Sequence, residues 1–262
     1  MINTYLDYNI FVDLIKSRNT INLTKYLKTN NINYFYSPAH IEEFAHADLS
    51  SGKESTNDYF DTISKITNNN TIRPLKLNAP LSFYLERPQN VYQRVRSNNG
   101  LLKTSQVETI DYSYFSAWSK QRKSNIFPID QKNINNISPD CIFFSEIFNS
   151  NLIKIFNTFF YPFCFCILKQ GYQYLEFRPY FYLEGAIESL LKILQFIGYH
   201  SDNEKSFRSA THDISHALYA TKCNIFVTND KKFSYRIKAV YSYMGVQTDI
   251  MNFNTYFNKI LS

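Results

Sequence analysis

Both ends of this 262-residue chain alternate short, apolar, strand-forming runs with segments that have apolar residues at helical spacing. Because strands that alternate with helices build a parallel sheet with helices on both faces, this alternation restricts the chain to the α/β class. The ends are then expected to meet in one domain. The segments in order are TYLD (4–7), IFVDLIKS (10–17), NYFYSPAHIEEFAHA (33–47), NIFVT (224–228), KKFSYRIKAVYSYMG (231–245) and VQTDIM (246–251).

The middle of the chain carries weaker signals. TIRPLKL (71–77) is the candidate for a further strand, and GAIESLLKILQFIG (185–198) has the pattern of an amphipathic helix that its last glycine ends. We therefore expect a single domain formed by about 1–50 and 205–262. Residues from about 50 to 205 would supply additional helices, the remaining sheet elements and a large, mostly helical or irregular insertion.

The composition indicates a globular protein, with 44% apolar and 19% charged residues. The net charge of +6 suits a polyanionic partner without demanding one. The longest apolar run, 155–168, is short for a membrane span and contains Asn157 and Pro162, so no membrane association is expected. The cysteines form no zinc-binding pattern and predict free, largely buried thiols in a reducing cytoplasm. They are Cys141, Cys164, Cys166 and Cys223.

Acidic residues recur at positions that such a fold brings together. Asp7 ends the first strand, and Asp230 comes just after the strand NIFVT, so both are expected at the carboxyl edge of the sheet, where ligands bind. Glu43 and Asp213 each lie in a row of alanines spaced three, four or seven residues from the acid. Such rows pack closely against a neighbouring layer, and a carboxylate on a packing face is costly to bury.

Converging carboxylates need a compensating charge, because two unit charges about 4 Å apart repel by about 4 kcal/mol at an effective dielectric constant of about 20. Hard oxygen ligands favour Mg²⁺ or Mn²⁺. Mg²⁺ held by a few carboxylates also binds water and phosphate oxygens, which is the equipment of metal-assisted phosphodiester hydrolysis. The competing interpretation is that each acid separately caps a helix or pairs with a basic residue.

The order and spacing of these acids resemble the PIN-domain nuclease family. In that family an Asp ends the first strand, and a Glu follows six residues after a helix-capping Ser, here Ser37 and Glu43. An Asp then opens a D-x-x-x-A-x-x-A helix, and Thr-x-Asp follows about seventeen residues later. The resemblance rests on LDYN (6–9), SPAHIEEFA (37–45), HDISHALYA (212–220) and FVTNDKKF (226–233).

The resemblance implies a Rossmann-like α/β/α sandwich and a Mg²⁺- or Mn²⁺-dependent endoribonuclease that hydrolyses single-stranded or structured RNA. It further implies a cytoplasmic toxin or defence effector, controlled by an antitoxin or an activating protein, and a possible homo-oligomer. The metal-binding and catalytic acids would be Asp7, Glu43, Asp213 and Asp230. The residues that support these acids or contact substrate would be Asn9, Thr228, His216, Lys231 and Lys232.

Several single-residue interpretations compete. Glu42 is an alternative to Glu43 but is also spaced to pair with His46 on the surface. His212 and His216 have the i, i+4 spacing of a zinc pair, and His216 alone could be a hydrogen-bonded helix histidine. Residues 87–132 mix basic and aromatic side chains, which suits single-stranded nucleic acid as well as a solvated loop.

Four other functions use a similar fold. A structure-specific DNA nuclease would keep the same acids. A catalytically inactive module that binds nucleic acid or protein would keep them only as structure. A phosphatase of the haloacid type would have Asp-x-Asp at the first strand, where this chain has Asn9, and a receiver-type switch would lack Glu43.

Overall fold

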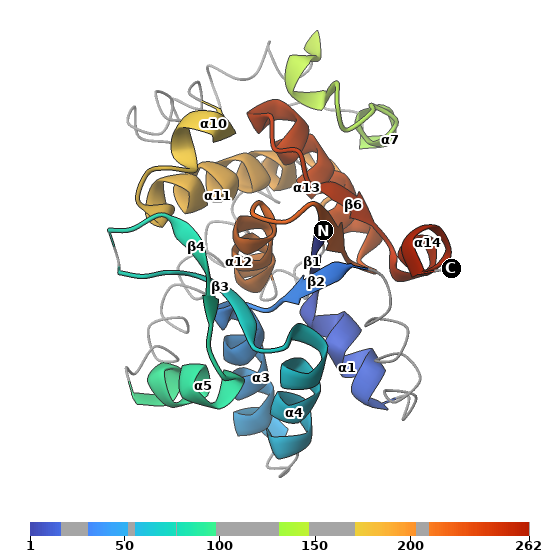
Figure 1. Ribbon diagram of the computed structural model, residues 1–262. Helices are drawn as coiled ribbons and strands as arrows, with labels where there is room; N and C mark the ends of the chain where they lie inside the picture. Colours follow the sequence, from blue (N-terminus) through green and yellow to red (C-terminus); the bar gives the residue numbers. More distant parts are fainter. Residues whose placement is uncertain are drawn as a thin grey trace.

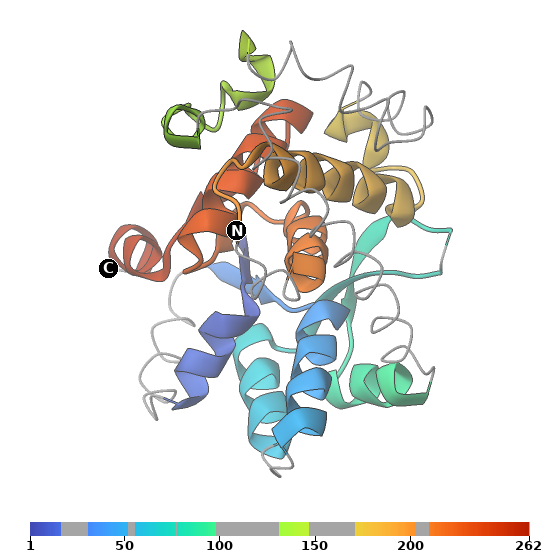
Figure 2. The same ribbon diagram turned by 180° about the vertical axis from the view of Figure 1, so that it is seen from behind.

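The computed structural model describes residues 1–16, 31–51, 56–76, 78–97, 131–146, 171–202 and 210–261. The views in Figures 1 and 2 show a sheet in the middle with helices on either side.

The central sheet joins the two ends of the chain. Its four parallel strands lie in the order β2-β1-β5-β6. β1 is central, and residues Thr4 to Leu6 pair in register with Ile225 to Val227 of β5. The prediction of one parallel sheet built from both termini is thus confirmed for the described residues. The strands are β1 (Ile2–Leu6), β2 (Ile32–Phe35), β5 (Ile225–Val227) and β6 (Asp249–Met251).

The candidate strand at 71–77 is present in part. β3 (Asn70–Pro74) adds beside β2 through a parallel bridge between Tyr36 and Thr71. β3 then pairs antiparallel with β4 (Leu81–Leu85), a strand that the sequence pattern did not predict. β4 has apolar residues at alternate positions, but only the first of them, Leu81, is buried.

The helices begin and end where local chemistry favours it. Pro38 stands at the first position of α3, where its missing N–H is no loss. α11 and α13 end at Gly198 and Gly245, whose positive φ angles of 87° and 77° favour glycine. The helices are α1 (Tyr8–Lys16), α3 (Pro38–Ser51), α4 (Thr56–Thr67), α5 (Pro88–Ser97), α7 (Gln131–Asn135), η1 (Ile142–Phe144), α10 (Tyr172–Leu175), α11 (Tyr180–Ile197), α12 (Ala210–Ala220), α13 (Lys231–Met244), α14 (Phe253–Tyr256) and the π-helical η3 (Phe257–Leu261).

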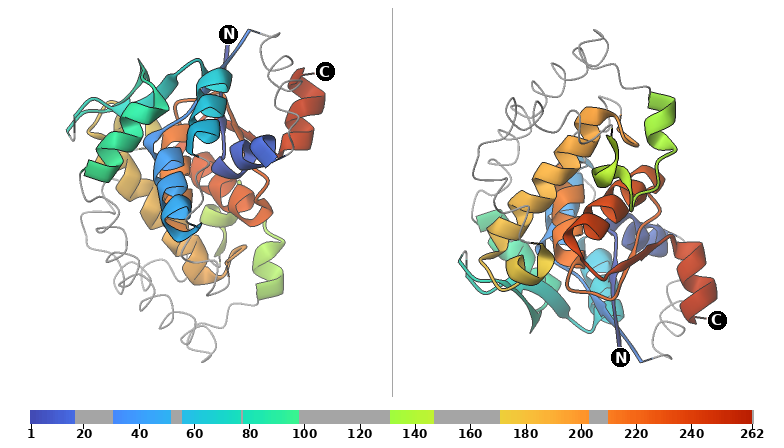
Figure 3. Two further views of the ribbon diagram at one scale, coloured as in Figure 1. Left: turned by 90° about the horizontal axis from the view of Figure 1, so that it is seen from below. Right: turned by 90° about the horizontal axis from the view of Figure 1, so that it is seen from above.

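Two hydrophobic cores lie on opposite faces of the sheet. Because successive side chains of a strand point to opposite faces, Tyr5 and Phe226 enter one core, and Leu6 and Val227 enter the other. The first core contains apolar residues of α11, α12 and α13, and the second contains those of α1, α3 and α4. Figure 3 shows these helices from below and from above. The fold is therefore α/β with a parallel sheet between two helical layers, which is compatible with a Rossmann-like sandwich.

Other expectations have mixed outcomes. Among the described helices, none combines the length and apolar character that a membrane crossing requires. Cys223 is a buried free thiol, but Cys141 is exposed, so the prediction of buried thiols is wrong at Cys141, which lies in a turn before η1. Cys164, Cys166 and the apolar run 155–168 lie outside the described residues.

Candidate functional site

The parallel pairing of β1 and β5 places their carboxyl ends side by side. The backbone N–H of Asp7 donates to the Val227 carbonyl at 2.9 Å. The Thr228 hydroxyl donates to Asp7 Oδ2 at 2.8 Å and accepts from the backbone N–H of Asp230 at 3.2 Å. The Tyr8 N–H donates to Asp7 Oδ1 at 2.8 Å. Asp7, only 7% exposed, is therefore held through both carboxylate oxygens, and Thr228 connects it to the loop that carries Asp230.

Asp230 itself caps a helix. Its Oδ1 accepts from the Phe233 N–H at 2.8 Å, which satisfies a free donor in the first turn of α13. Among the described residues, no hydrogen bond is made to its second carboxylate oxygen. The competing interpretation, that each acid caps a helix or pairs with a basic residue, is thus correct for Asp230. Its second carboxylate oxygen can still bind a ligand.

Glu43 meets His216 across two helices. Glu43 lies on α3 and His216 on α12, and His216 Nε2 is 3.3 Å from Glu43 Oε2. His216 Nδ1 is 2.8 Å from the Tyr5 hydroxyl. His216 is 1% exposed and Glu43 16%, so the pair reaches from the core to the rim of the sheet.

A second histidine lies beneath this pair. His40 Nε2 lies 2.7 Å from the Leu6 carbonyl, and its Nδ1 is 3.0 Å from the backbone N–H of Ser37. A carbonyl can only accept and an N–H can only donate, so these two partners define a neutral His40 with its proton on Nε2. Ser37 Oγ lies 2.6 Å from the Tyr5 hydroxyl, which completes a buried polar network under the acids.

The electrostatics of the network favour a charged His216. Burial, with the neighbouring His216 adding to it, lowers the pKa of His40. Burial also works against the charged form of His216, but Glu43, followed by Asp7 and Asp213, raises its pKa overall. Burial raises the pKa of Asp7, and Glu43 adds to this, while His216 and Thr228 oppose it.

Asp213 lies beside a buried cation. Arg236 on α13 is 4% exposed and forms an ion pair with Asp202 at 2.6 Å. Arg236 Nη2 is 3.8 Å from Asp213 Oδ2, and Arg236 Nη1 donates a hydrogen bond to Gln195 Oε1. Burial raises the pKa of Asp213 well above its ordinary value, and Asp7, Asp230 and Asp202 raise it further against the effect of Arg236.

The four predicted acids lie near one another, because Thr228 links Asp7 to the loop of Asp230, and His216, which contacts Glu43, lies on the same helix as Asp213. They do not form a coordination shell. Within the described ranges, no three His, Cys, Asp or Glu side chains are close enough together to hold a metal ion. Each acid instead has a protein partner of its own.

The donor chemistry nonetheless suits a hard cation. Carboxylate oxygens are the ligands that Mg²⁺ and Mn²⁺ prefer. In the described part of the chain, Glu43, Asp213 and Asp230 each interact through one carboxylate oxygen only, which leaves the other oxygen able to accept a ligand. Burial is the main cause of the raised pKa values of Asp7 and Asp213, and His216 and Arg236 respectively oppose it.

The alternative acid, Glu42, lies near His216 and Glu43 and also near Glu184. Burial raises the pKa of Glu42. Burial, then Glu188 and then Glu42 raise the pKa of Glu184 to about 7. Glu43, and not Glu42, is the neighbour that affects Asp7. This placement favours Glu43 as the acid of the rim.

The remaining predicted residues are dispersed. Asn9 is exposed on the first turn of α1, and within the described ranges no hydrogen bond links it to the acids. Lys232 donates to the Ser201 carbonyl at 3.0 Å, whereas Lys231 lines a groove beside α13.

Most of the basic and aromatic stretch at 87–132 lies outside the described residues. Two of its members have structural partners, since Arg94 binds Glu86 and Tyr92 packs on Phe60.

Sequence reasoning missed the residues that support the acids. In the sequence, Tyr5 has the pattern of an ordinary apolar strand residue. In the structure, its hydroxyl lies within 3.4 Å of Ser37 Oγ, His40 Nδ1 and His216 Nδ1. Arg236 had a usable signal, because it stands in the apolar row that Phe233, Ile237 and Val240 form on α13. An arginine in such a row requires a buried anion.

We compared the chain with protein-family models, with curated proteins and with solved structures, and none of these matches it.

Proposed function

We propose that this chain is a PIN-like endoribonuclease that uses Mg²⁺ or Mn²⁺. One observation carries the proposal: four acids that a sequence pattern selects, from β1, α3, α12 and the loop after β5, lie around one edge of the sheet and interact electrostatically. An edge formed by the carboxyl ends of parallel strands is where α/β folds bind ligands.

The residues around the acids have distinct roles in this proposal. Thr228 and the Tyr8 N–H fix the two oxygens of Asp7. His216 orients Glu43, and Arg236 limits the repulsion at Asp213. When bound, the divalent cation supplies a water of lowered pKa and stabilises the charge on the leaving oxygen.

The substrate and setting rest on the resemblance to PIN domains. The proposed substrate is single-stranded or structured RNA, with structure-specific DNA as the alternative. The proposed setting is a cytoplasmic toxin or defence effector that acts under the control of a partner protein, as a monomer or a homo-oligomer. The net charge of +6 agrees with a polyanionic substrate.

A second candidate is an inactive binding module of the same fold. This candidate is favoured because each acid already has its own partner in the protein. Asp230 caps α13, Glu43 contacts His216 and Asp213 lies near Arg236. In that case the carboxylates would contribute only to the structure.

A cleavage assay distinguishes the candidates. Purified protein is incubated with labelled single-stranded RNA, folded RNA, single-stranded DNA and flapped DNA, each with Mg²⁺, Mn²⁺ or EDTA. Asp7→Asn and Asp230→Asn variants are assayed in parallel, with circular dichroism as a check of folding. Asp61→Asn, which changes an exposed acid on α4, is the matched control.

The proposal expects metal-dependent RNA cleavage that both site variants lose and the control retains. Cleavage of DNA alone would keep the site and change the substrate. Failure to cleave all four substrates, together with calorimetry that shows no metal binding, would favour the binding module.

A further inference from the structure

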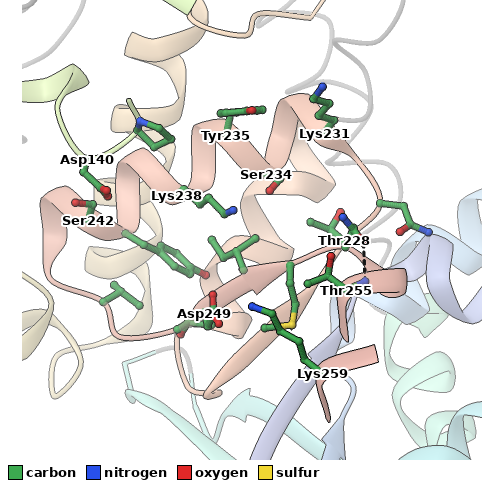
Figure 4. A pocket seen from close by; sticks show the side chains of 18 residues that line it. Asp140, Thr228, Lys231, Ser234, Tyr235, Lys238, Ser242, Asp249, Thr255 and Lys259 are labelled. Carbon is green, nitrogen blue, oxygen red and sulfur yellow. Dashed lines mark hydrogen bonds between the residues drawn. The ribbon is translucent and has the colours of Figure 1, made fainter. Parts of the chain in front are cut away.

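A groove runs along α13, beside the candidate site. It has a volume of about 1050 Å³ and lies between α13 on one side and β6 with the α14–η3 segment on the other (Figure 4). β6 is the outermost strand of the central sheet as far as the chain is described, so the groove follows an edge of the sheet.

The groove begins at the candidate site. Thr228, whose hydroxyl binds Asp7, and Asn229, which precedes Asp230, both line it. Asn229 Oδ1 accepts from the Phe253 N–H at 3.1 Å, which ties the loop after β5 to the start of α14. A ligand in the groove would therefore lie within reach of the edge where the acids gather.

Three lysines give the groove its charge. Lys231 and Lys238 come from α13 and Lys259 from η3, and all three side chains are exposed. Figure 4 shows Lys238 and Lys259 extending from opposite walls into the space between α13 and β6. In the part of the chain that the structure describes, no carboxylate forms an ion pair with any of them. Exposed ammonium groups without such partners can bind phosphates.

The acidic groups of the groove are fewer and lie differently. Asp140 is beside Ser242, near the end of α13 that is farther from Thr228, and Asp249 lies on β6 (Figure 4). Hydroxyl groups of Ser234 and Thr255 add further hydrogen-bonding capacity to the walls. A polar groove with an excess of lysine suits a flexible polyanion better than an apolar ligand.

We propose that this groove binds the phosphodiester backbone of a single-stranded nucleic acid and leads the strand to the acids around Asp7. That the strand is cleaved there rests on the proposed function, whereas binding in the groove does not. The outer edge of β6 could instead accept a peptide strand, but the lysines favour nucleic acid.

The test measures binding without cleavage. Fluorescence anisotropy follows a fluorescein-labelled 12-nucleotide oligouridylate in EDTA over a range of salt concentrations, with the full chain. The groove variant carries Lys231→Ala, Lys238→Ala and Lys259→Ala together. The matched control carries Lys16→Ala, Lys65→Ala and Lys76→Ala, which remove the same charge from exposed lysines on α1, on α4 and after β3. Cleavage of the same RNA with Mg²⁺ or Mn²⁺ is measured separately.

We expect the groove variant to bind at least tenfold more weakly and the control to stay within threefold of the unmodified protein. Loss of three phosphate contacts should also reduce the slope of log K against log salt by about 2, since each contact to a single strand contributes about 0.7.

Equal weakening of both variants, an unchanged groove variant, or no binding by the unmodified protein would each overturn the inference. An unchanged groove variant would mean that the nucleic acid binds elsewhere on the chain. If binding depends on the groove lysines but the RNA is not cleaved, the proposed nuclease activity is refuted and the binding groove is supported. If the groove variant binds normally and still cleaves, the binding groove is refuted and the nuclease activity is supported.

Discussion

His216 Nε2 on α12 lies 3.3 Å from Glu43 Oε2 on α3, and the same ring contacts the Tyr5 hydroxyl on β1 through Nδ1. One buried side chain thus joins two helices and the central strand of the sheet. Because Glu43 raises the pKa of His216, the stability of the fold should depend on the protonation of this ring.

The first prediction concerns this pH dependence. A folded-state pKa that is raised above the unfolded value stabilises the fold fully below the unfolded pKa, and this contribution is lost as the pH rises through the folded pKa. We therefore expect the stability difference between the unmodified protein and His216→Gln to be largest near pH 5.5 and to shrink towards pH 9. Urea unfolding at several pH values measures it.

His200→Gln is the control for that experiment. Burial, followed by Arg236 and two lysines, lowers the pKa of His200, so its contribution should change with pH in the opposite direction. Parallel pH profiles for the two variants would contradict the assignment of His216.

The second prediction concerns Thr228. Replacement by valine keeps the shape but removes the hydroxyl that binds Asp7 Oδ2 and the N–H of Asp230. We expect a loss of about 1–3 kcal/mol in the free energy of unfolding, the cost of buried polar groups left without a partner. Cleavage should also fall at least tenfold. Thr228→Ser, which restores the hydroxyl, should recover most of both, and a serine variant as impaired as the valine variant would refute this role.

The third prediction concerns Asp213. Because burial and neighbouring acids raise its pKa, its charged form costs stability at neutral pH. Asp213→Asn should therefore raise the melting temperature at pH 7.5 by about 2–4 °C, the shift that 1 kcal/mol produces in a chain of this size. The gain should disappear at acidic pH, where the unmodified carboxyl is protonated. Asp61→Asn, on the exposed face of α4, should change neither value, and a destabilised Asp213→Asn would contradict the account.

The fourth prediction compares two arginines. Arg236 is buried in its ion pair with Asp202, whose side chain is 10% exposed, so Arg236→Leu leaves a largely buried carboxylate without its partner and should cost about 3–5 kcal/mol. Arg94 is 46% exposed in its pair with Glu86, so Arg94→Leu should cost at most about 1 kcal/mol. Guanidinium unfolding of both variants measures the difference, and similar costs would refute the structural role of Arg236.

The sequence predicted the sheet well because its strands carry local signals. β1 and β5 are apolar on both faces, and each is followed by an acid and a helix. β4 was missed although LSFYL (81–85) has apolar residues at alternate positions, because so short a run does not by itself define a strand and its place in the fold depends on pairing with β3. Pairing of this kind is a tertiary effect that no local pattern records.

The candidate site was predictable only in part. The acids at the rim can be identified from the ends of strands and from helical spacing, because both features follow from the periodicity of the backbone. The partners of the acids depend on side chains that meet across the fold, as Tyr5 meets His216 at a separation of 211 residues. Arg236 and Asp202 likewise meet only after α11 and α13 have packed.

The proposed function depends most directly on the binding of a divalent cation by the acids around Asp7. Electron paramagnetic resonance of free Mn²⁺, titrated with the protein, measures this without a substrate. The account predicts saturable binding of one or two ions per chain that Asp7→Asn and Asp213→Asn weaken at least tenfold and Asp61→Asn leaves unchanged. No binding, or binding that these two site variants do not alter, would contradict it.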